Sequence, residues 1–325
     1  MKIGVKIVII MALALFWGWT SSHTHISLAT EKLTLNAAKV KKAPTSLTDS
    51  IWEKAKAVNI RLEGKEIFED MEVVVKTKSV YTKDSIHFLF NWKDATKSTL
   101  NGSWKYDGRK WSRIKSNEDL LALLFEITRI EGYAKDGCSA TCHNPIDGDA
   151  EIQMATPKST QTGDLWHWKA ARSDPYNYAD DTWMGAPGKK TGRKSDSGQG
   201  GDKKNITEDK SKPAFMQDPN KKPSAPGFIL ASEAVPITDY SIFKAGDVLT
   251  YRMPKKPSGS RADIKAKSKY ENGAWTLMLS RKLKTGHSDD VTFRTKKKYN
   301  FTMAVFDDSG DLDSYDSEVI VLKFK

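Results

Sequence analysis

The chain has 325 residues, and 52 Lys and Arg against 41 Asp and Glu give it a formal net charge of +11. This length is enough for one large domain or two smaller ones. The sequence contains no phosphate-cradling glycine loop, no Gly-x-Ser-x-Gly elbow and no His-Glu-x-x-His motif, which argues against nucleotide, serine hydrolase and zinc protease chemistry.

The chain opens with a leader. Two lysines precede an uncharged run from Ile7 to Trp19, which is shorter than the roughly 20 apolar residues that a membrane-spanning helix needs. This layout is typical of a secretory signal peptide, and Ala29 ends a small-residue cleavage site. We therefore expect residues 1–29 to be removed and residues 30–325 to form an exported, periplasmic protein, or a membrane-anchored one if the leader stays. For an exported protein, the basic charge favours an acidic protein partner or an anionic membrane surface over nucleic acid.

Most periodic segments beyond the leader predict β-strands, because they are rich in β-branched and aromatic residues and are bounded by turn residues. These segments are 71–82, 85–92, the hairpin 262–283, 298–307 and 317–325. Residues 119–128 form a nearly continuous apolar run that suits a strand buried on both faces. Asn272-Gly273 supplies the positive φ angles of a two-residue hairpin turn. Residues 165–173 predict a short helix capped by Asp164. Together these signals predict an all-β fold, an antiparallel, immunoglobulin-like β-sandwich with long loops.

One segment departs from this pattern. Residues 185–227 are dense in Gly, Pro, Ser and Lys and contain few apolar side chains. Such a segment buries too little surface to offset the entropy lost on ordering. We expect a flexible basic insertion in a single domain.

The only two cysteines, Cys138 and Cys142, lie close together, and His143 follows the second directly. A disulfide suits an oxidising compartment, but a loop this short stabilises a fold by only about 2 kcal/mol and leaves His143 without a role. A zinc site would need adjacent Cys142 and His143 to point at one metal, together with a fourth ligand. A pair of catalytic thiols would be prone to oxidation after export.

Covalent haem is the interpretation that uses all three residues. A c-type attachment site has two cysteines followed at once by a histidine, normally with two residues between the cysteines. The thiols add to the vinyl groups of the porphyrin, and the histidine binds the iron. Here the spacer is Ser139-Ala140-Thr141, which is one residue longer and still lets both sulfurs reach the vinyl groups. The sequence favours one covalent haem c, and a disulfide is the main alternative.

Several segments resemble the ethylbenzene dehydrogenase-related family, the cytochrome c-552/dimethyl sulfoxide reductase-like haem-binding domain. They are "GCSATCHN", "GDLWHWKAARSDPYNYADDTWM" (163–184), "GSRADIKAKSKYENGAWTLMLSRKLKTGHSDDVTF" (259–293), "IHFLFNWKDATKSTLNGSWKYDG" (86–108) and "YNFTMAVFDD" (299–308). The resemblance runs from about Asp49 to the end. It implies a β-sandwich that holds one haem at an end of the two sheets and passes electrons without bond chemistry of its own. Some members are γ subunits of periplasmic molybdoenzymes and bind haem b through a methionine and a lysine.

The resemblance assigns roles to individual residues. Cys138 and Cys142 would be the thioether anchors, and His143 the proximal iron ligand. Met154 and His167 are the candidates for the distal ligand, and a thioether there would raise the reduction potential relative to a second imidazole. The alternative for both residues is a structural role in packing.

Two further observations bear on the site. Lys169 and Arg172 could pair with haem propionates, for which the forked guanidinium is well suited; the alternative is an ion pair with Asp180 or Asp181. Residues 309–318, where many family members carry a histidine or lysine, contain neither, nor a methionine.

We therefore predict a c-type cytochrome, not an enzyme, that transfers single electrons between redox partner proteins, with a membrane-bound or molybdoenzyme complex as one setting. Two alternatives stay open. A haem-free carbohydrate-binding sandwich would join Cys138 and Cys142 in a disulfide and use its tryptophans to stack on sugars. A haem-based sensor would keep an iron position open.

Overall fold

The computed structural model describes residues 32–141, 154–187, 191–310 and 312–325. The predicted signal peptide, Cys142 and His143 lie outside the described residues. None of the helices in these ranges is long and apolar enough to cross a membrane.

Strands dominate the described residues. They are β1 (Thr34–Lys39), β2 (Val58–Gly64), β3 (Glu72–Tyr81), β4 (Ser85–Lys93), β5 (Ser103–Tyr106), β6 (Trp111–Ile114), β7 (Glu118–Glu126), β8 (Gly163–Lys169), β9 (Asp180–Met184), β10 (Arg193–Ser195), β11 (Asp202–Lys204), β12 (Phe215–Gln217), β13 (Ala234–Pro236), β14 (Val248–Thr250), β15 (Arg252–Pro254), β16 (Lys265–Tyr270), β17 (Ala274–Lys282), β18 (Lys298–Ser309), β19 (Tyr315–Ser317) and β20 (Ile320–Phe324). The helix α1 (Tyr133–Asp136) and the 3₁₀ turns η1 (Ser50–Lys54), η2 (Glu66–Phe68), η3 (Gly137–Ala140), η4 (Asp174–Tyr176) and η5 (Ser260–Ala262) are short.

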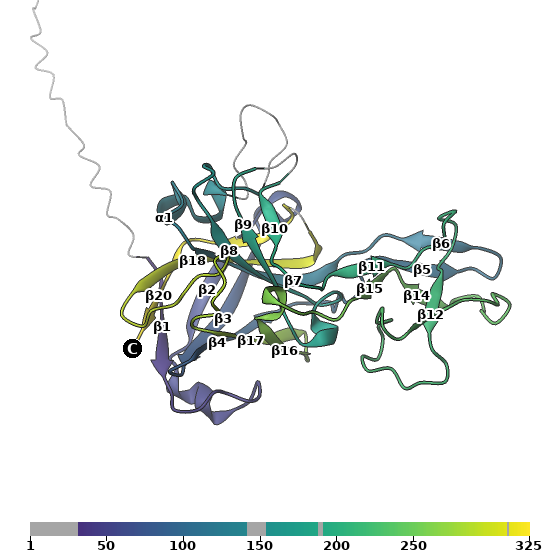
Figure 1. The fold of residues 1–325 in the computed structure, drawn as a ribbon, viewed down its shortest axis with the longest axis horizontal. Helices are drawn as coiled ribbons and strands as arrows, with labels where there is room; N and C mark the ends of the chain where they lie inside the picture. The colour runs from purple at the N-terminus through teal and green to yellow at the C-terminus, as the bar shows by residue number, and fades with distance from the viewer. Residues whose placement is uncertain (1–31, 142–153, 188–190, 311) are drawn as a thin grey trace, which may run out of the picture. The chain divides into compact units, whose positions relative to one another are not determined.

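The main strands form two layers (Figure 1). One layer has the order β10-β9-β8-β7-β18, and the other has the order β2-β3-β4-β17-β16. Neighbours within each layer are antiparallel. The layers join where β19 pairs with both β18 and β2, and where β1 pairs with both β20 and β3. The predicted all-β antiparallel sandwich is confirmed.

Aromatic side chains from the two layers meet in the core. The rings of Phe88 on β4 and Trp166 on β8 lie 5.9 Å apart, and those of Trp92 and Trp168 on the same strands lie 6.2 Å apart. β4 and β8 share no backbone pairing, so these contacts join the faces of opposite layers. Aromatic pairs of this kind stabilise a core by about 0.5–1.5 kcal/mol beyond the burial of their area.

Most of the predicted elements are confirmed. The continuous apolar run is β7, which is buried on both faces, and Asn272-Gly273 turns the β16–β17 hairpin with φ angles of 54° and 69°. The short helix predicted for residues 165–173 is wrong, because residues 163–169 form β8 between β7 and β9. The side chains of β8 are buried on both faces. Tertiary packing therefore overrides the helix-capping signal of Asp164.

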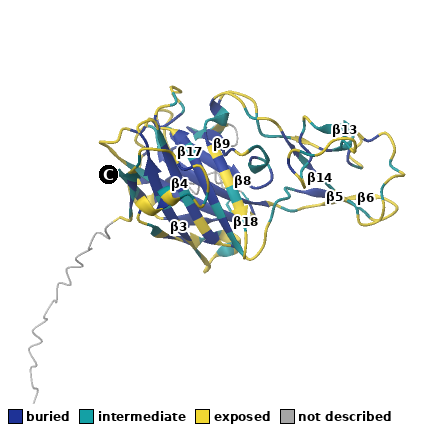
Figure 2. Ribbon diagram, turned by 90° about the horizontal axis from the view of Figure 1, so that it is seen from below, coloured by how far each residue is buried: buried dark blue, intermediate teal, exposed yellow. Residues whose placement is uncertain are grey.

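A smaller group of strands stands beside the sandwich (Figures 1 and 2). β14, β5 and β6 form a three-stranded sheet, and β11–β15 and β12–β13 form two further pairs. Trp104, Trp111 and Tyr251 are buried in a separate cluster at this place. Of residues 185–227, those described include β10, β11 and β12, and Asn205 bonds to the carbonyls of Phe215 and Thr250. The flexibility expected for this insertion stays a prediction.

Candidate functional site

A cavity of about 390 Å³ lies on the outer face of the β9-β8-β7-β18 layer. Strand alternation separates this face from the core: Leu121 and Leu123 point into the sandwich, whereas Leu120, Ala122 and Leu124 line the cavity. The same alternation supplies the rest of the wall, which consists of Leu165, His167, Met184, Thr302, Ala304 and Phe306. The volume is within the range of roughly 300–1,000 Å³ that is typical of small-molecule pockets.

The wall is flat at its centre. Ala122 on β7 and Ala304 on β18 lie opposite each other in the strand register, and both line the cavity. Their methyl groups leave room between the larger side chains of Leu120, Leu124 and Phe306. An apolar wall with small central side chains suits a flat, apolar ligand such as a porphyrin ring.

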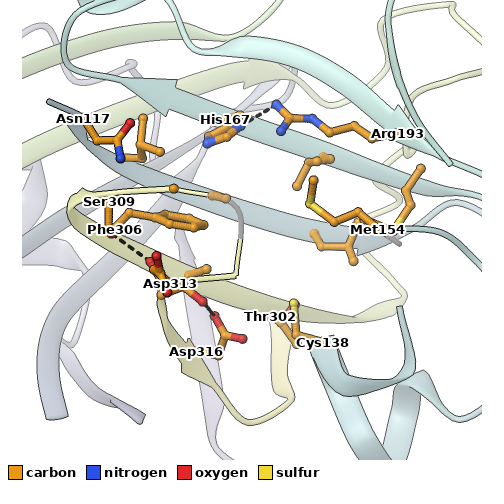
Figure 3. A pocket seen from close by; sticks show the side chains of 18 of the residues that line it. Asn117, Cys138, Met154, His167, Arg193, Thr302, Phe306, Ser309, Asp313 and Asp316 are labelled. Atoms are coloured by element: carbon orange, nitrogen blue, oxygen red, sulfur yellow. Dashed lines mark hydrogen bonds between the residues drawn. The ribbon is translucent and has the colours of Figure 1, made fainter. Parts of the chain in front are cut away.

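Residues from distant parts of the chain complete the cavity. Cys138 comes from the turn η3, Met154 from the segment after residues 142–153, and Asp313 and Asp316 from the region before and within β19. Figure 3 shows Cys138, Met154 and His167 around the same cavity. Three of the residues singled out from the sequence thus line one site.

A glycine brings the cysteine turn close to the wall. Gly137 has a φ angle of 58°, in the left-handed region that favours glycine. A Cβ atom there would lie 3.1 Å from Cγ2 of Thr302 and 3.3 Å from Cγ2 of Val319. η3 can therefore pack against β18, and this contact places Cys138 beside the cavity.

His167 is neutral and has one nitrogen without a partner. Its side chain is buried, and burial together with the nearby Arg193, Lys169 and Arg172 lowers its pKa well below the ordinary value. The Arg193 guanidinium donates to Nδ1 at 2.5 Å, and Nε2 has no hydrogen-bond partner in the described part of the chain.

The contact with Arg193 fixes the tautomer of His167. A guanidinium can only donate, so Nδ1 must accept, and in a neutral imidazole the proton then sits on Nε2. With this contact in place, Nε2–H of His167 is a hydrogen-bond donor at the cavity and has no lone pair for a metal.

The cavity also contains two thioethers. Met154 packs against the outer-face cluster of apolar residues, and Met184 at the end of β9 is fully buried in that cluster. The sequence singled out Met154 but not Met184. The sequence signal that could have found Met184 is strand alternation. Met184 lies two residues beyond Thr182 in β9, so both side chains are on the face of the layer that His167 shares.

The two basic residues predicted for the site have different positions. Arg172 lines the cavity and forms an ion pair with the buried carboxylate of Glu118. Lys169 does not line the cavity: its buried ammonium pairs with Asp180, to which Arg261 also donates. The ion pair with Asp180, which was the alternative for Lys169, is what the structure contains. Arg193 and Arg252, which the sequence did not single out, add positive charge to the lining.

The lining residues fit a haem in chemical terms. Apolar side chains of β7, β8 and β18 lie in the same lining as the thioether of Met154 and the cysteine turn, and Arg172, Arg193 and Arg252 supply positive charge for propionates. Arg172 and Arg252 already pair with Glu118 and Asp202, and Asp313 and Asp316 add negative charge to the lining. The resemblance implied a haem at an end of the sheets, whereas this cavity lies on an outer face. The reason is that β7 and β18 carry apolar side chains on both faces, so a second cluster of buried residues forms outside the sandwich.

Comparison with known proteins identifies the family. The model of the family described as "Ethylbenzene dehydrogenase" matches residues 49–317. The chain belongs to the ethylbenzene dehydrogenase-related family.

No curated protein sequence matches this chain. Among solved structures, a candidate carbohydrate-binding protein from Bacteroides uniformis is similar with a TM-score of 0.38 and 8% identity, over 90% of this chain and 100% of that chain. A family 9 carbohydrate-binding module from Caldicellulosiruptor kristjanssonii, in complex with glucose, has a TM-score of 0.37 and 9% identity, over 90% of this chain and 95% of that chain. At these values the likeness carries no argument about a ligand.

Proposed function

We propose that the protein is an exported c-type cytochrome that holds one covalent haem in the outer-face cavity and transfers single electrons between periplasmic redox partners. The observation that supports it is that Cys138, Met154 and His167 line one cavity, although they come from three separate segments. When bound, a haem supplies the one-electron chemistry.

The residues around the cavity have distinct roles in this proposal. Cys138 and Cys142 anchor the porphyrin, and His143 is the proximal ligand. Met154 is the distal ligand, because its thioether needs no change of protonation. His167 donates from Nε2 into the cavity while Arg193 holds its Nδ1.

Burial of the cavity wall has a functional consequence. The apolar cluster in the wall, with the segments of Cys138 and Met154 beside it, would shield one side of the cofactor from water. Low exposure and a thioether ligand both favour a high reduction potential. The basic surface, with a net charge of +11 over the whole chain, would steer an acidic partner. This partner could be a soluble redox protein or a subunit of a membrane-bound or molybdoenzyme complex.

The test is covalent attachment. The full chain is exported from a host with haem-attachment machinery, and the protein is extracted with acid–acetone before a pyridine haemochrome spectrum is recorded. We expect the haem to stay with the wild-type protein. In Cys138→Ser and Cys142→Ser we expect one thioether bond and a displaced α band, and in the double variant a haem that extracts. Ser139→Ala, at an exposed position of the same turn, is the matched control and should behave as wild type.

Each other outcome contradicts the proposal in a definite way. Haem that extracts from the wild-type protein means b-type binding, and the cysteines then have another role. A protein that never takes up haem is not a cytochrome, and the carbohydrate-binding alternative with a disulfide becomes the better hypothesis.

A further inference from the structure

A second group of side chains lies on the inner face of β8 and β9. Asp164 on β8, Asp181 on β9 and Asp290 in the loop before β18 have carboxylate oxygens within 4.8 Å of one another. Asp196 and Asp289 form a group of the same dimensions with Asp290. Asp164, Asp181, Asp196 and Asp290 are all buried. We refer to these four residues as the inner carboxylate cluster.

One guanidinium faces this cluster. Arg281 on β17 is itself buried and reaches across from the opposite layer. Its Nη1 lies 2.5 Å from Oδ2 of Asp164, 3.3 Å from Oδ1 of Asp290 and 3.8 Å from Oδ2 of Asp181. The other basic group in contact, among the described residues, is His287, whose Nδ1 lies 3.6 Å from Asp290 and 2.9 Å from Asp263. The single positive charge of Arg281 neutralises only one of the four negative charges that the ionised carboxylates carry.

The cluster leaves carboxylate oxygens unsatisfied. Asp181 is 0% exposed, and neither of its carboxylate oxygens has a hydrogen-bond partner among the described residues. One oxygen each of Asp164, Asp196 and Asp290 is also buried without a hydrogen bond. Buried carboxylates without partners are strongly unfavourable, and native proteins satisfy nearly all such atoms. These oxygens indicate a missing ligand with positive charge.

A different carboxylate group in the same protein shows the contrast. Asp94, Asp119 and Asp307 also approach within 4.8 Å. There Asp119 accepts hydrogen bonds from the backbone N–H groups of Ser98 and Asp308 and from Nε1 of Trp275. One oxygen of Asp94 is buried without a partner among the described residues, whereas in the inner carboxylate cluster both carboxylate oxygens of Asp181 and one each of Asp164, Asp196 and Asp290 are.

The dimensions and chemistry of the cluster suit a hard divalent cation. Calcium binds oxygens at 2.3–2.6 Å, so two ligands of one ion can be up to about 5 Å apart, and the carboxylate oxygens of Asp164, Asp181 and Asp290 are close enough to share one ion. Carboxylates favour Ca²⁺, Mg²⁺ or Mn²⁺ over softer metals. Ca²⁺ accepts irregular geometry and many carboxylates, whereas Mg²⁺ needs near-octahedral geometry and keeps several waters. An irregular group of buried carboxylates fits Ca²⁺ better.

We propose that the inner carboxylate cluster binds one calcium ion through Asp164, Asp181 and Asp290, with Asp164 shared between the ion and Arg281. The ion ties β8 and β9 to the loop that contains Asp290. It therefore fixes the inner face of β8 and β9, and the outer face of the same strands forms part of the cavity wall. This site does not depend on the cavity holding a haem.

The competing occupant is a proton. Without a cation, burial and the neighbouring carboxylates raise the pKa of Asp181 well above its ordinary value, and burial followed by Asp289 and Asp290 raises the pKa of Asp196 to about 8. A protonated cluster and a calcium-loaded cluster differ in metal content and in their response to added calcium.

The experiment uses the full chain. Metal content is measured by elemental analysis after purification in calcium-containing buffer. The protein is then unfolded with a chelator, because a buried ion exchanges slowly, and refolded in chelator-treated buffer with or without CaCl₂ or MgCl₂. Tm is read by circular dichroism. Terbium is a second probe, since Arg281 lies 4.6 Å above the ring of Trp166, and this tryptophan can sensitise a nearby lanthanide.

We expect about one calcium per chain and a Tm that CaCl₂ raises by about 5 °C at saturating concentration, with a smaller effect of MgCl₂. Asp181→Asn should lose the bound calcium, the Tm response and the terbium signal. Asp94→Asn, which changes the other carboxylate group, is the matched control and should keep all three. If Asp181→Asn does not fold, Asp290→Asn provides the same test.

Two results would overturn the proposal. The first is wild-type protein that contains no calcium after purification and has the same Tm with and without CaCl₂, which means that protons neutralise the cluster. The second is a calcium response that survives in Asp181→Asn and Asp290→Asn but is lost in Asp94→Asn, which assigns the ion to the other carboxylate group.

Discussion

The outer and inner faces of strands β8 and β9 bury different chemistry. On the outer face, Leu165, His167 and Met184 line an apolar cavity. On the inner face, Asp164 and Asp181 meet Arg281 at the edge of the aromatic core. In sequence these two sets of residues alternate, so neighbouring positions on one strand serve different sites.

This difference shows how the two faces depend on each other. On the outer face, Ala122 and Ala304 carry small side chains between Leu120, Leu124 and Phe306, and the cavity lies over them. The inner face is fixed by charge and by aromatic packing, with Arg281 4.6 Å from Trp166. A rigid inner face therefore positions a wall that a ligand must fit.

The most disruptive change to this arrangement is the removal of the guanidinium. Arg281→Met leaves the buried carboxylates of the inner cluster without their counter-charge, and breaking a buried ion pair in this way costs about 3–5 kcal/mol. We expect the free energy of unfolding, measured by urea denaturation, to fall by that amount.

The control for Arg281 is an exposed arginine. Arg61 pairs with Glu72 at 2.7 Å, and both side chains are more than half exposed. Because exposed ion pairs contribute only about 0–1 kcal/mol, Arg61→Met should be nearly neutral. If the two substitutions lowered the free energy of unfolding by the same amount, the buried ion pairs of Arg281 would contribute no more to stability than an exposed pair.

A second test concerns the other buried carboxylate group, which contains Asp94. Burial, followed by repulsion from Asp119, raises the pKa of Asp94 to about 7 in the folded protein. The folded state then binds the proton more tightly than the unfolded state, so this stabilisation is full below pH about 4 and is lost as the pH rises to about 7. Each pKa unit is worth about 1.4 kcal/mol, and we expect wild type to lose about 2 kcal/mol between pH 5 and pH 7 from this group.

Asp94→Asn removes the titrating group and keeps an acceptor for the backbone N–H of Thr96. The unfolding free energy of this variant should therefore vary less between pH 5 and pH 7 than that of wild type, in urea titrations at each pH. A variant with the same pH profile as wild type would show that Asp94 does not bind this proton.

On the outer face, the cavity can be filled directly. Ala304 lines the flat centre of the wall, and Ala304→Phe would occupy the space of a planar ligand. We expect haem content, measured as the ratio of haem to protein absorbance, to fall about tenfold or more, with only a modest change in Tm. Val74→Phe, at a position 46% exposed on β3, is the control of equal size and should load haem normally. Unchanged haem content in Ala304→Phe would place the cofactor elsewhere.

The sequence predicted the sandwich well because the strand signals are local. Residues 119–128, the hairpin at Asn272-Gly273 and the last two strands all carry their own pattern. The segment 165–173 failed because its periodicity is ambiguous when both faces are buried, as they are in β8. The strands of the cluster with Trp104 and Tyr251 were also missed: β5 and β6 are only four residues long each, and the other partner of β5, β14, lies more than a hundred residues away.

The site was predictable only in part, for a physical reason. Cys138, Met154, His167 and Arg172 were chosen for their chemistry, and they do line one cavity. The partner of Lys169 and the Arg193 contact that fixes the tautomer of His167 depend on how strands pair. The inner carboxylate cluster joins residues that are far apart in sequence, so no local pattern indicates it.

The finest distinction on the outer face is between Met154 and His167. Because Nδ1 of His167 accepts from Arg193, His167 is a donor, and our proposal therefore assigns the distal position to Met154. Met154→Leu should therefore keep the covalent haem but open the iron, so that carbon monoxide shifts the ferrous spectrum. Met184→Leu, a second thioether in the same wall, and His167→Gln should stay insensitive to carbon monoxide. If His167→Gln opens the iron and Met154→Leu does not, His167 is the ligand, and the Arg193 contact must break when haem binds.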